Sequence, residues 1–115
     1  MRATHVFAGV AVSDFTVARD WYERLFGSPP DSLPKEGEAV WRPAASASIY
    51  VSLDPARAGS GLLTLAVENL DDLRRDLRRR SQPVEEGSEA NGMRTLLATD
   101  PDGNAIKFFE DPGSS

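Results

Sequence analysis

Residues 5–27 read HVFAGVAVSDFTVARDWYERLFG, and this stretch decides the fold because its pattern recurs later in the chain. Its first part alternates between two faces, and a period of two indicates a β-strand. Asp14 follows where a helix N-cap belongs, since its carboxylate can accept an amide hydrogen bond from the first helical turn. Apolar residues then recur at helical spacing from Phe15 to Leu25, and Gly27 is placed to end the helix. The stretch predicts a strand, a cap and a helix.

The same order returns in the second half of the chain. A shift of about 55 residues places Val12 on Val67, as expected of an internal repeat. A strand is predicted at 62–67, Asn69 is predicted to cap a helix, and a leucine stripe over 70–77 marks that helix. The sequence therefore predicts two structural modules of one kind.

The remaining elements follow from β-prone runs and from the Gly and Pro residues between them. Asp100-Pro101-Asp102-Gly103-Asn104 predicts a tight turn, because Pro presets φ and Gly or Asn tolerates a positive φ. The further predicted strands are 39–42 and 46–53 on either side of Pro43, then 93–99 and 105–110, and the predicted loops are 29–37 and 83–92, the second with room for a short edge strand.

The whole pattern predicts an α+β fold for a single domain spanning residues 1–115. Two βαβββ modules occupy about 3–55 and about 60–111, and 112–115 is expected to be a frayed tail beyond the last strand. The chain length of 115 residues and the 40% of apolar residues suit one domain with one core.

Composition narrows the function classes. The formal net charge is −5, and an acidic surface repels phosphate backbones, so we expect no nucleic-acid partner. No apolar run is long enough to span a membrane, and the N-terminus lacks the apolar core of a signal peptide. The chain has no cysteine, which suits a reducing compartment. The expected location is the cytoplasm.

Two segments carry a resemblance to a known family. Val12-Ser13-Asp14, followed by Ala18, Trp21-Tyr22, Leu25 and Gly27, resembles the first-module signature of the vicinal-oxygen-chelate superfamily, which includes glyoxalases, bleomycin resistance proteins and extradiol dioxygenases. Residues 100–106, DPDGNAI, resemble its last turn and strand. The resemblance implies βαβββ modules that form a curved mixed sheet with a half-barrel cleft, and a homodimer.

Metal-dependent members of the superfamily carry one metal ligand on each of four strands. The resemblance places Phe7, Ser52, Leu62 and Lys107 at these positions. Phenyl and aliphatic groups cannot ligate a metal, a lone hydroxyl is a poor ligand and an ammonium repels a cation. We therefore expect no metal site and no cofactor.

His5 is the only histidine, and two roles are open for it. It lies two residues before Phe7, hence on the same face of the strand. A register slip would bring it into the cleft as a ligand or general base. Alternatively, it is a surface or structural residue near the N-terminus.

The cleft implied by the resemblance and by strand alternation is mostly apolar, which is typical of a small-molecule pocket. Lys107 is either a counter-charge for an anionic ligand or an exposed strand lysine. Aromatic and aliphatic members of the set equally suit a collapsed core. The candidate ligand-binding residues are Phe7, Tyr50, Ser52, Leu62, Thr64, Lys107 and Phe109, together with Gly9, and with Trp41 as a further candidate for stacking on a planar ligand.

Three functions remain open. The favoured one is a metal-free protein that binds a hydrophobic or planar small molecule, resembling the drug-sequestering, antibiotic-resistance branch of the superfamily. The alternative is a glyoxalase- or dioxygenase-like enzyme, a lyase, isomerase or oxygenase, that uses a shifted His5 or the pair Lys107 and Tyr50. The third is a domain that serves only dimerisation or regulation.

Overall fold

The computed structural model of the chain describes residues 1–111, and the tail predicted at 112–115 lies outside the described residues. A strand, a helix and three strands occur in this order twice, as the sequence predicts. The first unit comprises β1 (Val6–Val12), α1 (Phe15–Phe26), β2 (Ser32–Lys35), β3 (Glu38–Ala44) and β4 (Ala47–Leu53). After a short 3-10 turn, η1 (Pro55–Arg57), the second unit comprises β5 (Leu62–Val67), α2 (Leu70–Arg79), β6 (Glu85–Ser88), β7 (Arg94–Thr99) and β8 (Ala105–Glu110).

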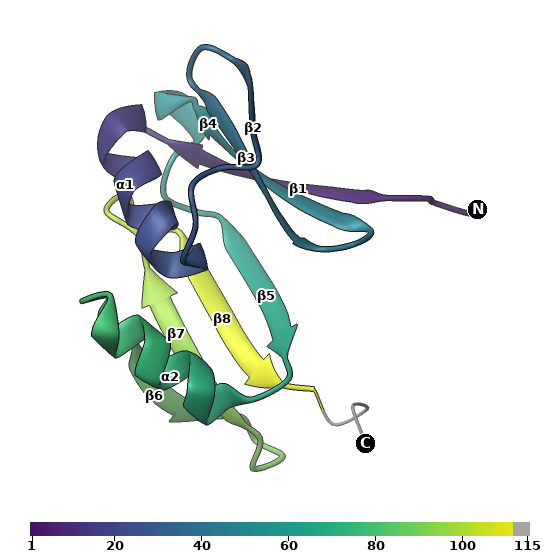
Figure 1. Cartoon of the computed structure of the whole chain (residues 1–115), viewed down its shortest axis with the longest axis vertical. Coiled ribbons are helices and arrows are strands. Elements are labelled where there is room, and N and C mark those ends of the chain that lie inside the picture. The colour runs from purple at the N-terminus through teal and green to yellow at the C-terminus, as the bar shows by residue number, and fades with distance from the viewer. Residues whose placement is uncertain (112–115) are drawn as a thin grey trace.

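Each unit builds its own four-stranded mixed sheet (Figure 1). The strand order is β1-β4-β3-β2 in the first sheet and β5-β8-β7-β6 in the second. In both, the first strand runs parallel to the last one, and the other neighbours are antiparallel. The α+β fold of two βαβββ modules is thus confirmed, with two separate, open sheets.

Both helices begin as predicted. The Asp14 carboxylate accepts the Val17 amide at 3.1 Å, and the Asn69 side chain accepts the Asp72 amide at 2.9 Å. Gly27 ends α1 in the left-handed conformation, with φ of 80°. Because L side chains are strained there, a glycine is the favoured residue at this position. Within residues 1–111, neither helix is long and apolar enough to cross a membrane.

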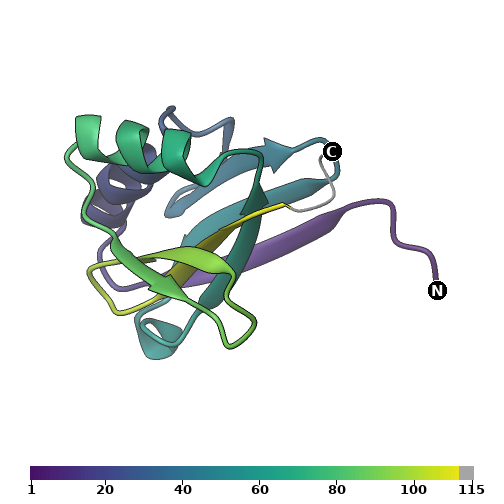
Figure 2. The ribbon, with the colours of Figure 1, turned by 90° about the horizontal axis from the view of Figure 1, so that it is seen from below.

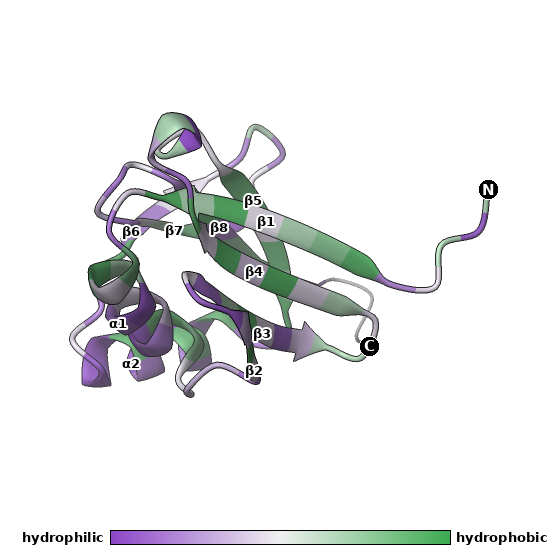
Figure 3. Ribbon diagram, turned by 90° about the horizontal axis from the view of Figure 1, so that it is seen from above, coloured by the Kyte–Doolittle hydropathy of each residue, from purple (hydrophilic) through white to green (hydrophobic). Residues whose placement is uncertain are grey.

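The core lies between the helices and one face of each sheet. Helix α1 packs on β3 and β4, and α2 packs on β7 and β8. Figure 2 shows both helices on the same side of the molecule. In Figure 3, the green of β1 marks its apolar residues, of which Val10 and Val12 are buried against the core. Within residues 1–111, no helix packs on the opposite face of either sheet.

Two prolines lie in strands where the sequence predicted a loop or a break. Residues 32–35 form the edge strand β2, although 29–37 was predicted to be a loop. Pro34 fits this edge because a missing amide there removes no bond from the ladder interior. Strand β3 also continues through Pro43, where the pairing register with β4 shifts between Trp41 and Ala44. Such a bulge accommodates Pro43, which has no backbone N–H to donate to the ladder.

The predicted turn at 100–104 also joins the two modules. The side-chain amide of Asn104 donates to the Ala11 carbonyl in β1 at 2.9 Å, and its Oδ1 accepts the Gly61 amide at 2.7 Å. The Asp100 carboxylate accepts the Tyr22 hydroxyl of α1 at 2.8 Å. Burial, and then the charge of Asp100, raise the pKa of Tyr22 far above its ordinary value. The side chains of Asp100 and Asn104 are both buried, so their hydrogen bonds hold the two modules together largely away from water.

A candidate ligand-binding groove on the first sheet

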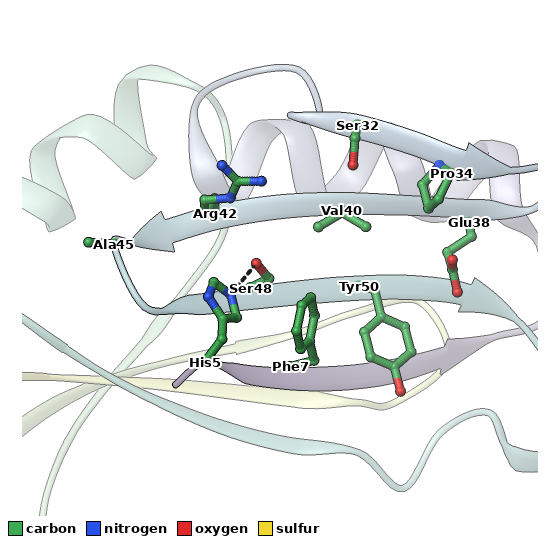
Figure 4. Close-up of a pocket in the computed structure, with 10 residues that line it drawn as sticks. All are labelled: His5, Phe7, Ser32, Pro34, Glu38, Val40, Arg42, Ala45, Ser48 and Tyr50. Atoms are coloured by element: carbon green, nitrogen blue, oxygen red, sulfur yellow. Dashed lines mark hydrogen bonds between the residues drawn. The ribbon is translucent and has the colours of Figure 1, made fainter. Parts of the chain in front are cut away.

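A groove of about 740 Å³ runs across the open face of the first sheet (Figure 4). Side chains at alternate positions of neighbouring strands point into it. It is lined by His5 and Phe7 at β1, Ser32 and Pro34 of β2, Glu38, Val40 and Arg42 of β3, Ser48 and Tyr50 of β4, and Ala45 of the turn between β3 and β4.

Strand alternation separates this groove from the core. On β3, Glu38, Val40 and Arg42 face the groove, whereas Ala39 and Trp41 between them are buried. This is the period of two expected for a sheet with one covered face. The groove therefore lies on the uncovered face of the sheet, and the residues at every second position of each strand form its walls.

The ring of Tyr50 lies across the neighbouring strand β1. A Cβ atom placed on Gly9 would come within 2.4 Å of Tyr50 Cζ, far inside van der Waals contact. Gly9 and Tyr50 are directly paired in the parallel ladder. The absence of a side chain at Gly9 thus lets the phenol lie flat against the sheet as part of the groove floor.

His5 reaches the groove without any register slip. Its Nε2 lies 2.8 Å from the Ser48 hydroxyl oxygen, and its ring centre lies 4.5 Å from that of Phe7. Ser48 is buried although it lines the groove, with His5 hydrogen-bonded to its hydroxyl. His5 therefore lines the groove, and its hydrogen bond to Ser48 gives it a structural contact there as well.

A second groove of about 560 Å³ adjoins the first. Glu38 and Tyr50 line both grooves, so they form the boundary between them. Gly9 and Ser52 line the second groove. Of the candidate residues on the first sheet, Phe7 and Tyr50 therefore meet in the first groove, and Ser52 lies beyond Tyr50.

The candidates from the second module lie elsewhere. Leu62 and Thr64 of β5 and Lys107 and Phe109 of β8 belong to the second sheet, and none of them lines either groove. The Lys107 ammonium lies 2.6 Å from a carboxylate oxygen of Glu89. The chain by itself does not bring these four residues together with Phe7 and Tyr50 in one pocket.

Trp41 lies on the core face of β3, which corrects its assignment to the cleft. It is 2% exposed, and its ring centre lies 5.5 Å from that of Phe26 and 6.1 Å from that of Tyr22. Its indole N–H donates to the Ser28 carbonyl at 2.9 Å. The physical reason is strand parity, because Trp41 alternates with the charged residues Glu38 and Arg42 in β3 rather than sharing their face.

The same parity would have identified groove residues that the sequence analysis missed. The run 38–42 reads EAVWR, with charged and buried residues alternating. Once Ala39 and Trp41 are assigned to the core, Glu38, Val40 and Arg42 must face the open side. Ser48 carries the same signal, since it lies two residues before Tyr50 in β4 and therefore on the same face of the strand.

Strand pairing also corrects one of the four positions that the resemblance matched to the metal ligands of the superfamily. Gly9 pairs with Tyr50 in the first sheet and Thr64 pairs with Lys107 in the second. Tyr50, rather than Ser52, is therefore the counterpart of Lys107. A constant shift along the sequence fails here because the segment 64–107 is longer than the segment 9–50.

The four positions do not fit a metal ion. Phe7 and Leu62 have no donor atom, and the ammonium of Lys107 is occupied by Glu89. A single phenol at Tyr50 would remain as the only oxygen. Within residues 1–111, no three His, Asp or Glu side chains gather closely enough to hold a metal.

Comparison with known proteins identifies relatives of the whole chain. A glyoxalase / bleomycin resistance protein from Catenulispora acidiphila DSM 44928 is 39% identical, with a TM-score of 0.89 over 96% of this chain and 100% of that chain. No protein-family model matches the sequence, and no curated protein matches it.

More distant structures share the fold alone. A lactoylglutathione lyase from Agrobacterium tumefaciens is 16% identical with a TM-score of 0.75, over 96% of this chain and 95% of that one. A bleomycin resistance determinant encoded on the transposon Tn5 is 15% identical, also with a TM-score of 0.75, over 92% of this chain and 96% of that one. Taken with the 39% identical relative, which spans nearly the full length of both chains, the two βαβββ modules and their sheet order lead to one conclusion: this chain belongs to the glyoxalase/bleomycin resistance protein family.

Proposed function

We propose that this protein binds a small hydrophobic or planar molecule in the first groove. The observation that carries the proposal is Phe7, whose side chain is left 65% exposed at a groove of about 740 Å³. That volume lies within the range of roughly 300–1,000 Å³ found for ligand pockets. The rings of Phe7 and Tyr50 supply flat apolar surface, and a planar ligand would gain both area burial and ring stacking there.

The proposal includes a homodimer. Leu62 on the open face of the second sheet is 69% exposed, as Phe7 is on the first. A second copy that places its Leu62 face over the Phe7 groove would bury both, and the same contact would form twice by symmetry. This pairing would also bring Lys107 of the second sheet toward the ligand. We expect the protein to work in the cytoplasm, where a chain without cysteine needs no oxidising environment.

Binding is proposed to need no metal ion or other cofactor, because the four positions compared with metal ligands do not fit one. Dialysis against Zn²⁺, Ni²⁺, Fe²⁺ and Mn²⁺, followed by elemental analysis, should leave far less than one metal per chain. Near-stoichiometric metal that is lost in His5→Ala would contradict this part of the proposal.

The experiment for binding is a thermal-shift and fluorescence screen of aromatic acids, aromatic amines and natural-product drugs. Phe7→Ala should weaken the best hits about tenfold, since one apolar wall of the groove is removed. Leu33→Ala is the matched control, because Leu33 is a similarly exposed apolar residue of β2 that does not line the groove. Equal weakening by both variants would place the ligand elsewhere.

A glyoxalase-like enzyme, acting as a lyase, isomerase or oxygenase, is the second candidate function. The observation that favours it is the His5 imidazole in the groove, 2.8 Å from the Ser48 hydroxyl and on the same open face as Tyr50. An imidazole can act as a general base near neutral pH. Mass spectrometry of the recovered hits decides between the two, since unaltered compounds support binding and compounds altered only when His5 is present support catalysis.

A further inference from the structure

We propose that the first groove selects a zwitterionic ligand, in which a planar apolar centre carries a cationic group at one end and an anionic group at the other. This inference rests on the proposed binding function and names the ligand class for the same groove. It follows from the distribution of charge along strand β3.

The two ends of the groove carry opposite charges. Glu38 and Arg42 both line it, and both belong to β3 (Figure 4). Four residues along a strand separate their α-carbons by roughly 13 Å. Figure 4 shows Glu38 at one end beside Pro34, and Arg42 at the other end near His5. At neutral pH the groove therefore has a negative and a positive end.

The section between the charges is apolar. Val40 lies midway between Glu38 and Arg42 on the same face of β3, and the rings of Phe7 and Tyr50 lie opposite it (Figure 4). A charged group placed in this section would lose water without gaining a partner. The centre of the ligand must accordingly be uncharged and is best planar.

Neither charge is used inside the chain. Among residues 1–111 the ion pairs involve other side chains, such as Arg57 with Asp54 and Lys107 with Glu89. Glu38 and Arg42 form none, and their spacing prevents them from pairing with each other. Lys35 pairs with Glu38 across the strands in the backbone ladder and both residues line the second groove, yet no ion pair joins their two side chains. Both groove charges are thus available to a ligand.

The test uses four biphenyl probes that differ only in their end groups. The zwitterion is 4′-(aminomethyl)biphenyl-4-carboxylate. Its methyl amide is the cation, the 4′-hydroxymethyl carboxylate is the anion, and the 4′-hydroxymethyl methyl amide is the neutral probe. An ion pair that is exposed or half-buried changes affinity by a factor of about two to five. With one such pair at each end, the zwitterion should bind about tenfold more tightly than the neutral probe.

Substitutions assign each charge to its end of the groove. Glu38→Gln should remove the advantage of the ammonium and leave that of the carboxylate, and Arg42→Gln should do the reverse. Glu36→Gln, in the turn before β3, and Arg79→Gln, on α2, are matched controls, because both side chains lie outside the groove and should change nothing.

The outcomes separate this inference from the binding function on which it rests. If the neutral probe binds and the charged groups add nothing, the charge assignment is wrong and the binding function stands. If the cation alone binds as tightly as the zwitterion, Arg42 has no role and the inference also fails. If none of the four probes binds, this groove does not bind planar ligands and both proposals fail.

Discussion

The phenol ring of Tyr50 lies over the α-carbon of Gly9, so closely that a Cβ atom on Gly9 would come within 2.6 Å of three ring and hydroxyl atoms. Gly9→Ala should therefore displace the ring from the groove floor and weaken a planar ligand about tenfold. The free energy of unfolding should fall by less than about 1 kcal/mol, because the ring is the outer end of a half-exposed side chain and can swing away. Isothermal titration and urea unfolding measure the two quantities.

A double-variant cycle tests the cause of that change. When Tyr50 is already alanine, Gly9→Ala has no ring to displace and should leave the remaining affinity unchanged. An equal loss of affinity with and without Tyr50 would show that the methyl group acts on the ligand directly.

Asn104 is expected to be a main determinant of how the two modules are joined. It is 1% exposed and bonds to Ala11 in the first module and to Gly61 at the start of the second. Asn104→Ala leaves half-buried backbone groups of Ala11 and Gly61 without these partners, so the free energy of unfolding should fall by roughly 1–3 kcal/mol. Asn91→Ala is the matched control, since Asn91 is exposed and bonds only to the nearby Met93 amide. Equal destabilisation of both variants in urea would contradict the prediction.

Tyr22 should make stability fall at alkaline pH. Its pKa is raised in the folded chain by burial and by Asp100, whereas the unfolded chain ionises it near its ordinary value of about 10. The stabilisation linked to this proton is fully present below pH of about 10 and is lost as the pH rises above it.

Tyr22→Phe isolates this effect. Near neutral pH, the variant should be less stable than the wild type by roughly 1–3 kcal/mol, because the Asp100 carboxylate loses a buried hydrogen-bond donor. Between pH of about 8 and about 11, the difference between the two proteins should stay constant up to pH of about 10 and shrink above it. Urea unfolding across this range provides the measurement, and a constant difference would mean that Tyr22 does not keep its proton on folding.

The proposed dimer can be disrupted at the second sheet. Light scattering at micromolar concentration should give about twice the chain mass of 12.5 kDa. Leu62→Asp should yield monomers, since a charge would be buried in an apolar contact. Val17→Asp on α1, also an exposed apolar position, should leave the dimer intact. A wild-type monomer at high concentration, or a dimer that survives Leu62→Asp, would exclude this interface.

The sequence by itself determined the elements whose signals are local. Asp14 and Asn69 predicted the two helix starts because an N-cap bond forms within one turn, and β8 begins at Ala105 directly after the predicted turn. The repeat predicted the βαβββ order, since each module folds by the same periodicities. Of the groove, alternation in β1 and β4 correctly placed Phe7 and Tyr50 on the open face.

The tertiary structure alone decided the features that depend on contacts between distant parts of the chain. Strand β2 has no alternating hydrophobic pattern of its own, and it forms because β3 offers an edge with which it can pair. Trp41 belongs to the core because α1 supplies Tyr22 and Phe26 on that side of the sheet. The counterpart of Lys107 is Tyr50, because hydrogen-bonded pairing between strands sets the register, whereas counting along the chain ignores loops of unequal length. Contacts between residues far apart in sequence leave no local signature, which is why the groove's position and its two charged ends emerge only in the folded chain.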